Sequence, residues 1–427
     1  MRAARRSGAP VAVVAGLVAL VVIVLAGAAA LIAAATGDDD GPLGGSSADP
    51  LPQRWSVDPY DISSDYGTFA AVDGTVTGWL LPTESGWVTM TEPSTPAARL
   101  VSLDPVDGAV QWSLDLPESR CTQLETNLDE LVCLTRPSGG GFQLVRVGAG
   151  DGAFVGDPVA VDLGHVPYLL TPLGDGLLVL TADRVLSGVG LDGAVRWSAP
   201  IPIDSDADLT YLEIDVAHYP DATLLQLGWS NGTVHVTTAG EVRVLSCRAV
   251  AATPDAWVCE GDDETTGFAP DGTEQWAGPW DDYYLVDRYQ KITPVVLVDN
   301  WDGSVTAIDA TTGGRGDPVP VTDSSEHFSF LGDADQPAVT AEDSVTMLDP
   351  TGANVLWQTH VDDEYLNIAE GAVLDGTLVM SGERTYGFDL VTGEQLWSSD
   401  FLTTTLSVHD GALVGTGYGE VTRYEMP

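Results

Sequence analysis

Lysine is almost absent from this chain of 427 residues. Lys291 is the only one, and the 17 basic residues face 63 acidic ones, for a formal net charge of −46. A surface this acidic has no basic patch to neutralise phosphates, so it repels nucleic acid and anionic membranes. The charge predicts a well-solvated surface. Loose attraction for divalent cations or for a basic partner is the alternative interpretation.

Familiar catalytic motifs are missing as well. The histidines are scattered, without an H-x-x-x-H or H-E pair, and no phosphate-cradling G-x-x-x-x-G-K occurs. "GWSNG" (228–232) matches G-x-S-x-G by letter. A nucleophile elbow needs a helix after the serine, however, and the "TVHVTTAG" that follows is typical of a strand. We therefore interpret Ser230 as a hairpin residue and predict no catalytic residue.

No metal site is predicted either. "GDDE" (261–264) and "DNWDG" (299–303) contain calcium-ligand types, but they lack the alternating acidic spacing of a compact calcium loop. Solvated turn residues are the preferred interpretation of both stretches.

Cysteine is scarce: four residues form two pairs, and the members of each pair are twelve positions apart. The pairs are 126 residues apart, and neither has the C-x2-C spacing or the neighbouring histidines of a zinc site. An even count in an exported chain predicts disulfides. We expect two local bridges, each between neighbouring strands: Cys121–Cys133 and Cys247–Cys259.

The N-terminus holds the one long apolar run. Residues 11–35 carry no charge and are long enough to cross a bilayer as a helix. Arg2, Arg5 and Arg6 precede the run and Asp38–Asp40 follow it, which predicts a cytoplasmic N-terminus (1–10), a span (11–35), a flexible Gly/Ser/Pro-rich linker (36–53) and an extracytoplasmic region (54–427). A cleaved signal peptide is the alternative, but the run exceeds a usual signal core.

A phrase of strand, glycine turn and strand recurs along the extracytoplasmic region, for example "YGFDLVTGEQLW" (386–397) and "VSLDPVDGAVQW" (101–112). The segments alternate apolar and polar residues, and a period near forty with several strands is typical of a β-propeller blade. Asp-Gly or Thr-Gly supplies the positive φ of each hairpin. The turn glycines are Gly108, Gly152, Gly193, Gly240, Gly272, Gly313, Gly352 and Gly393.

A tryptophan follows the turn by four or five residues in five units, where we expect its ring to pack against the neighbouring blade. In three units Gly156, Val244 and Asp317 stand in its place, and we expect those blades to be looser. The blade tryptophans are Trp112, Trp197, Trp276, Trp357 and Trp397.

The two ends of the region complement each other. "RWSVD" (54–58) resembles an isolated Trp strand, whereas the C-terminal unit stops after "EVTRYEM" (420–426) without one. Joining them in a composite blade would close the ring and remove an exposed edge. The fold class is therefore all-β. We predict a propeller of eight blades with four antiparallel strands each, with seven or nine as alternatives.

The run Asp-x-x-Thr-Gly-x-x-x-Trp in "DLVTGEQLW" (389–397) resembles the repeat of the pyrroloquinoline-quinone-like (PQQ-like) β-propellers. That family includes quinoprotein dehydrogenases and the non-enzymatic assembly factor BamB, and the composition resembles that of its actinobacterial membrane-anchored members. The resemblance implies a quinone and calcium only where two adjacent cysteines and long insertions build the site. This chain has neither, so no cofactor is expected.

These observations predict a single-pass protein of the cell membrane whose propeller is a non-catalytic binding scaffold for an envelope protein or cell-wall component. "WDDYYLVD" (280–287) is a candidate contact patch, with an inward-facing strand as the alternative. The competing function is a PQQ-dependent dehydrogenase-like enzyme or a small-ligand sensor that uses the channel.

Overall fold

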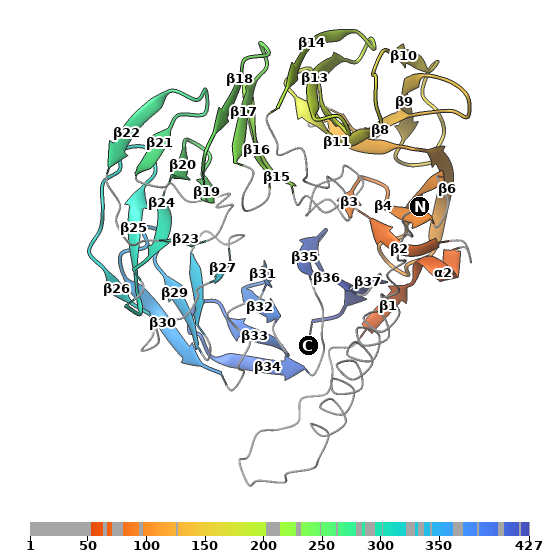
Figure 1. The fold of residues 1–427 in the computed structure, drawn as a ribbon. Coiled ribbons are helices and arrows are strands. Elements are labelled where there is room, and N and C mark those ends of the chain that lie inside the picture. Colours follow the sequence, from red (N-terminus) through yellow and green to blue (C-terminus); the bar gives the residue numbers. More distant parts are fainter. Residues whose placement is uncertain are drawn as a thin grey trace, which may run out of the picture. The chain divides into compact units, whose positions relative to one another are not determined.

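The computed structural model describes residues 53–62, 66–70, 80–93, 97–124, 127–201, 214–227, 232–247, 249–261, 264–278, 284–286, 295–300, 302–321, 329–331, 337–341, 344–361, 370–381, 384–399, 405–417 and 420–426. In this part of the chain the strands form nine antiparallel sheets, eight of four strands and one of five. The sheets follow one another around a ring (Figure 1). The predicted propeller is confirmed, but the predicted count of eight blades is wrong.

We number the blades 1 to 9. The strands of blades 1 to 4 are β2 (Tyr66–Ala70), β3 (Leu81–Pro82), β4 (Trp87–Pro93), β5 (Ala97–Leu103) and β6 (Val110–Pro117); β7 (Arg120–Leu124), β8 (Asn127–Thr135), β9 (Phe142–Gly148) and β10 (Val159–Val161); β11 (Pro167–Leu173), β12 (Gly176–Thr181), β13 (Val185–Gly190) and β14 (Val195–Pro200); β15 (Ile214–Tyr219), β16 (Ala222–Leu227), β17 (Thr233–Thr237) and β18 (Val242–Leu245).

The strands of blades 5 to 9 are β19 (Ala249–Ala252), β20 (Trp257–Glu260), β21 (Thr265–Phe268) and β22 (Glu274–Gly278); β23 (Tyr284–Val286), β24 (Val295–Asp299), β25 (Ser304–Asp309) and β26 (Val319–Pro320); β27 (Ser329–Leu331), β28 (Ala338–Ala341), β29 (Ser344–Leu348) and β30 (Val355–His360); β31 (Glu370–Leu374), β32 (Thr377–Ser381), β33 (Thr385–Asp389) and β34 (Gln395–Ser399); β35 (Thr405–His409), β36 (Ala412–Gly417), β37 (Glu420–Tyr424) and β1 (Gln53–Val57).

Blade 9 explains the difference in the count. Each of the eight turn glycines lies between the last two strands of one of blades 1 to 8. In blade 9 the third strand, β37, ends the chain, and the fourth, β1, begins the propeller. This blade has no such turn, so it adds one sheet to the eight that the glycines mark. The predicted joining of the two ends is confirmed.

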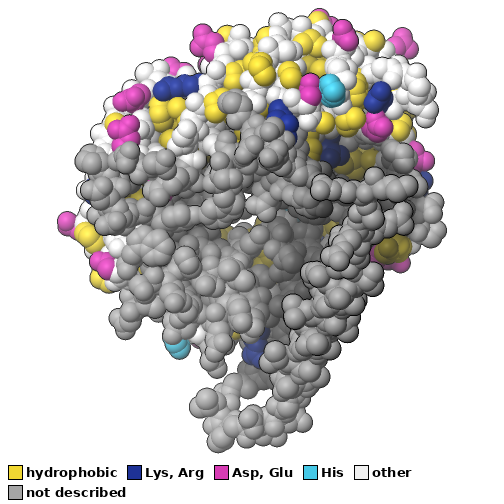
Figure 2. Space-filling model, in the orientation of Figure 1, with side chains coloured by type: hydrophobic (Ala, Val, Ile, Leu, Met, Phe, Trp, Pro, Cys, Tyr) yellow, Lys and Arg dark blue, Asp and Glu magenta, His cyan; other side chains and the backbone are white. Residues whose placement is uncertain are grey.

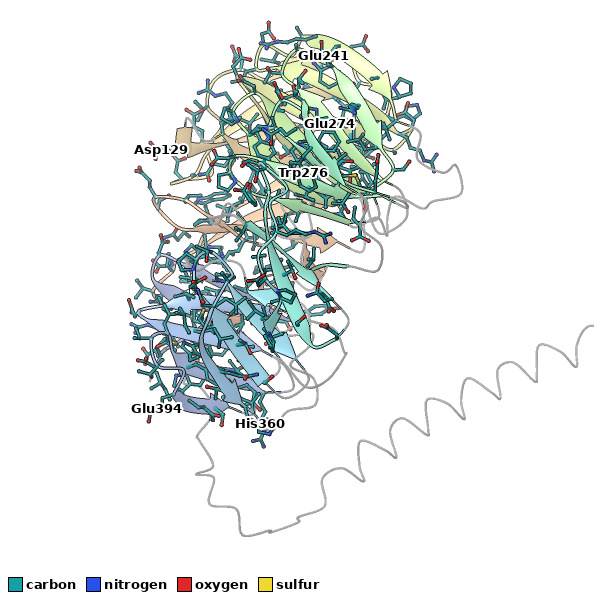
Figure 3. The ribbon with its side chains drawn as sticks, turned by 90° about the vertical axis from the view of Figure 1, so that its left-hand side faces the viewer. Asp129, Glu241, Glu274, Trp276, His360 and Glu394 are labelled. Atoms are coloured by element: carbon teal, nitrogen blue, oxygen red, sulfur yellow. A yellow bond between two sulfur atoms is a disulfide. The ribbon has the colours of Figure 1, made fainter. Side chains whose placement is uncertain are left out.

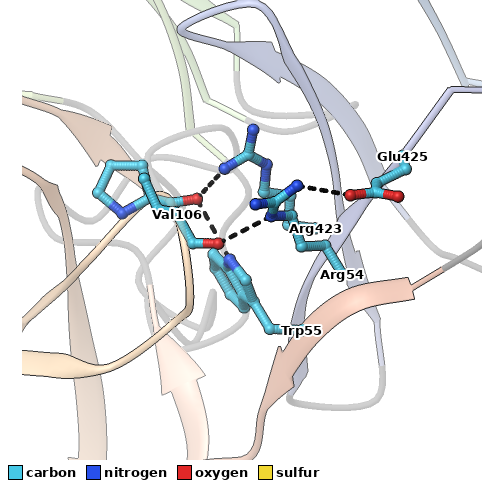
Figure 4. Close-up of polar contacts among 6 residues, drawn as sticks. Arg54, Trp55, Val106, Arg423 and Glu425 are labelled. Atoms are coloured by element: carbon cyan, nitrogen blue, oxygen red, sulfur yellow. Dashed lines mark hydrogen bonds and ion pairs between the residues drawn. The ribbon is translucent and has the colours of Figure 1, made fainter.

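The strand β1 is held on two sides (Figure 4). It pairs with β37 in antiparallel register, and Arg54 forms an ion pair with Glu425 at 2.5 Å. Toward blade 1, Arg54 Nε donates to the carbonyl of Val106 at 3.0 Å and Trp55 Nε1 donates to the carbonyl of Pro105 at 3.2 Å. These contacts tie the first strand of the propeller to the last strand and to the turn of blade 1.

The hydrophobic core is divided among the blade interfaces. Each sheet shares a buried cluster with the next, for example Trp87 and Val101 of blade 1 with Val414 of blade 9. Eight further clusters join the remaining neighbours in order. Since the last cluster returns to the first blade, the packing of the described residues forms a closed circuit.

The helix α2 (Pro59–Ile62) follows β1 directly. Among the described residues no helix is long and apolar enough to cross a membrane. The predicted span at 11–35 lies outside those residues, as does the predicted linker up to the start of β1.

Replacing Trp55 by alanine should test the closure. Trp55 is 8% exposed, and its ring centroid lies 5.6 Å from that of Trp87, so its removal should lower the free energy of unfolding by about 3–5 kcal/mol. Denaturant unfolding followed by fluorescence measures this loss. Arg54→Ala is the control: its ion pair and its hydrogen bond to Val106 are both solvent-exposed, so their loss should cost only about 0–1 kcal/mol. Equal effects of the two substitutions would contradict closure through the indole.

Candidate binding site

The most regular feature of the described residues is the docking of an indole on the turn of the next blade. In four cases Nε1 donates to the carbonyl three residues before the turn glycine, over 2.8–3.2 Å: Trp55 to Pro105, Trp112 to Ala149, Trp276 to Ala310 and Trp357 to Leu390. Figure 3 shows Trp276 on its blade. Each of these rings therefore contacts the neighbouring blade through a hydrogen bond to its turn.

The turn glycine makes this docking sterically feasible. Gly393 has a φ of 72°, a conformation that L side chains rarely adopt. A Cβ at this position would lie 2.5 Å from the Trp357 ring. Glycine is therefore required twice, by the backbone conformation and by the approach of the ring.

The length of the glycine turn differs between blades that accept an indole hydrogen bond and blades that do not. In blades 1, 2, 6 and 8 the glycine N–H donates to the carbonyl four residues earlier, and in blades 3, 4, 5 and 7 to the carbonyl three residues earlier. The four longer turns are those that accept an indole N–H. Trp197 packs on Gly240 of a shorter turn, without a hydrogen bond from its Nε1 in the described part of the chain. In the longer turn the glycine N–H does not use the carbonyl three residues earlier, and this is the carbonyl that accepts the indole N–H.

Other side chains fill the three interfaces that lack the tryptophan. Between blades 4 and 5, His235 lies against Gly272 and its Nε2 is 2.9 Å from the carbonyl oxygen of Pro270. Arg243 donates to the carbonyl of Gly272 at 2.9 Å and lies over the Phe268 ring. Val159 with Ala160 and Leu297 with Ala307 contact the turn glycines of blades 3 and 7.

A β-bulge precedes each of the five blade tryptophans. In blade 7, for example, Met347 pairs with Trp357 and Leu348 pairs with Val355, so Leu356 is the extra residue. The bulge residues of blades 1, 3, 5, 7 and 8 are Gln111, Arg196, Gln275, Leu356 and Leu396. Trp397 itself packs between blades 8 and 9. All five bulge residues are exposed, so the fold does not require an apolar side chain at this position.

Aspartates organise several turns. Asp389 accepts hydrogen bonds from the backbone N–H of Thr392 at 2.7 Å and from the hydroxyl of Thr392 at 2.8 Å. These bonds hold the pKa of Asp389 below its usual value. The hydroxyl of Thr311 acts in the same way on Asp309, at 2.6 Å, and lowers its pKa. These carboxylates stabilise the turns that receive the indoles.

Both predicted disulfides are present. Cys121 of β7 pairs directly across the sheet with Cys133 of β8 inside blade 2. Cys247 lies after β18, in the connection between blades 4 and 5, and bonds to Cys259 of β20. The second bridge therefore differs from the predicted link between two strands, because one cysteine lies just before the first strand of its blade. All four cysteines are buried.

A pocket of about 440 Å³ lies between the connection from blade 1 to blade 2 and the loop from β8 to β9 of blade 2. Its polar lining includes Glu118 and Arg136, whose charged groups are 3.4 Å apart. Glu118 has a φ of 45°, which is uncommon for a residue with a side chain. Gly139 lines the rim, where added side-chain atoms would meet nothing. The pocket presents both a cation and an anion to a ligand.

The remaining sequence candidates do not form a site in the described residues. Most of "WDDYYLVD", the first four residues of "GWSNG" (including Ser230) and the centre of "GDDE" lie outside these residues. In "DNWDG", Asn300 donates to the hydroxyls of Ser304 and Thr306, and Asp302 accepts from Ser304. These side chains stabilise their own hairpin.

A metal site would need several donor side chains in one place among the described residues. They include no group of three or more His, Cys, Asp or Glu side chains placed to hold a metal ion. The adjacent cysteine pair of a quinoprotein site also does not fit here, because each cysteine is bonded to a partner twelve positions away.

Residues 301–425 match the family model described as "Outer membrane protein assembly factor BamB". The match covers less than a third of the chain and spans blades 7 and 8 with parts of blades 6 and 9. It agrees with the resemblance of the repeat to PQQ-like, BamB-like propellers. No curated protein matches the sequence.

Among solved structures, BamB from Moraxella catarrhalis is similar with a TM-score of 0.47 and 14% identity, over 88% of this chain and 100% of that chain. The computationally designed Ika8 protein has a TM-score of 0.46 and 12% identity, over 90% and 100%. Apo AztD from Citrobacter koseri has a TM-score of 0.39 and 11% identity, over 77% and 96%. At these values the similarities carry no assignment of activity.

Replacing Trp357 by phenylalanine should separate the hydrogen bond from the ring packing. The change keeps an aromatic ring but removes the N–H donor to Leu390, so the free energy of unfolding should fall by about 1 kcal/mol more than it does in Trp197→Phe. Denaturant unfolding of both variants measures the difference. An equal loss would show that the indole N–H contributes nothing to the interface.

Acid titration should reveal the role of the turn carboxylates. A lowered pKa in the folded protein stabilises the fold above the unfolded pKa of about 3.9, and this stabilisation is lost as the pH falls through the folded pKa. Asp389→Ala should therefore lower the melting temperature at pH 7 and lower it less at pH 3. Glu394→Ala, next to the same turn, is the control. A constant difference between Asp389→Ala and the unsubstituted protein from pH 7 to pH 3 would contradict this assignment.

Proposed function

We propose that this protein is a membrane-tethered, extracytoplasmic binding scaffold of the cell envelope, without catalysis of its own. The observation that carries the proposal is the closed, disulfide-containing ring. Disulfides persist in oxidising compartments outside the cytoplasm. A ring closed by its own first strand holds surface loops on a rigid frame, which is where binding sites commonly lie.

The N-terminal sequence supports a tether. An apolar run with arginines before it and aspartates after it favours export of everything that follows. The predicted Gly/Ser/Pro-rich linker of 18 residues would span about 21–25 Å on average if it behaves as a flexible coil. Since β1 follows this linker directly, the ring would lie close to the extracytoplasmic surface of the membrane that the predicted helix crosses. Its acidic side chains, scattered over the described part of one face (Figure 2), would keep it from adhering to anionic lipid.

A small-ligand sensor is the second candidate function, and the pocket on blade 2 favours it. Glu118 has an unusual backbone conformation and forms an ion pair with Arg136. Two glycines in the same lining, Gly139 and Gly140, leave room beside these charges. Strained residues cluster at functional sites. The paired charges suit a small ligand that carries both an anionic and a cationic group.

Crosslinking in intact cells tests the scaffold. A photoreactive residue placed in turn at exposed positions around the ring should yield a reproducible adduct with one envelope protein. An adduct with a cytosolic protein would contradict the proposal. Turnover of an alcohol or a sugar by the purified chain, after addition of quinone and calcium, would contradict the absence of catalysis.

A further inference from the structure

The outer rim of blades 7 and 8 carries exposed apolar side chains, and two of them, Leu356 and Leu396, stand at bulge positions that are polar in blades 1, 3 and 5. Ten large hydrophobic residues are exposed in the described part of the chain. Four of them belong to these two blades: Val355 (40% exposed) and Leu356 (47%) on β30, Val391 (83%) in the turn after β33, and Leu396 (51%) on β34. We call these four residues the rim patch.

The contacts of Trp357 bring the parts of the rim patch together. Trp357 directly follows Leu356, and its ring lies on Gly393, at the end of the turn that carries Val391. Its Nε1 donates to the carbonyl of Leu390, and the hydroxyl of Thr359 donates to that of Gly393 at 2.6 Å. The turn of blade 8 is thus fastened to β30, and Leu396 follows on the same hairpin.

The other blades provide an internal comparison. Leu356 and Leu396 are the bulge residues of blades 7 and 8, and the same position holds Gln111, Arg196 and Gln275 in blades 1, 3 and 5. The bulge forms equally well with polar residues, so local geometry does not explain the two leucines. An exposed apolar cluster without a structural reason is typical of an interaction surface.

The charge around the rim patch restricts its occupant. Residues 344–361 and 385–399 contain no Lys or Arg, but they contain Asp349, Asp389 and Glu394. Figure 3 shows Glu394 and His360 on this part of the rim. A second copy of the chain, itself at −46, and an anionic lipid surface would both be repelled. A protein segment with apolar side chains and flanking lysines or arginines is complementary in both respects.

We propose that the rim patch is the docking surface for such an apolar and basic segment of an envelope protein. The proposal rests on the proposed scaffold function and deepens it. Apolar contacts would supply affinity, and the acidic surroundings would exclude acidic partners and speed the encounter with basic ones.

Position-specific photocrosslinking of the full-length chain in intact cells tests this. A photoreactive residue at 356 or 396 should give adducts at least tenfold more abundant than one at the matched bulge positions 111 and 275. Peptide mapping should place the adduct on an apolar stretch flanked by Lys or Arg. With the probe at 356, Leu396→Gln should reduce the yield several-fold, and so should an increase in salt from 50 to 500 mM in isolated membranes.

Glutamine is the matched substitution because it occupies this bulge in blades 1 and 5, so the melting temperature should not change. Crosslinks to a second copy, crosslinks to lipid, or equal yields at all four positions would overturn the rim patch. If adducts form only from positions elsewhere on the ring, the scaffold function stands without this interface. If no position gives an adduct, both proposals fail.

Discussion

The ring depends on one repeated interaction, an indole of one blade packed on the glycine turn of the next. The indole buries apolar surface between two sheets, and its N–H satisfies a backbone carbonyl that the turn leaves exposed. Because the contact joins consecutive blades, it also determines how one sheet is oriented against the next. Where the tryptophan is missing, the turn is shorter and other side chains fill the gap, although Trp197 also packs on a shorter turn, without the hydrogen bond.

Closure extends this interaction to the ends of the chain. Trp55 joins blade 9 to blade 1 in the same way as Trp112 joins blade 1 to blade 2, by donating its indole N–H to the turn of the next blade. It lies on β1, the first strand in the sequence, whereas its sheet neighbour β37 is the last. The strand nearest to the predicted membrane anchor is therefore also the one that completes the ring. Any separation of β1 from β37 would open an edge strand and uncover the cluster around Trp87.

Much of the fold was predictable because its signals are local. Glycine turns, alternating strands and cysteine spacing predicted a propeller, composite closure and both disulfides. The predicted count of eight was wrong, and the alternative of nine is right, because the eight sheets with a glycine turn and the composite sheet are all separate blades. The candidate site was less predictable. His235 and Arg243 replace a tryptophan from different strand positions, and the pocket of Glu118 and Arg136 joins two loops. The leucines at 356 and 396 could have been noticed in the sequence, because they stand just before a tryptophan where the other repeats have Gln or Arg.

By itself the sequence determined the repeating unit, because turn conformation and strand alternation depend on residues within a few positions of one another. It also determined the charge of the surface and the segments that meet at the closure. Only the tertiary structure decided the number of blades, the hydrogen bond of each indole and the grouping of apolar residues on one part of the rim. These depend on contacts between residues some thirty to several hundred positions apart, which no local pattern encodes.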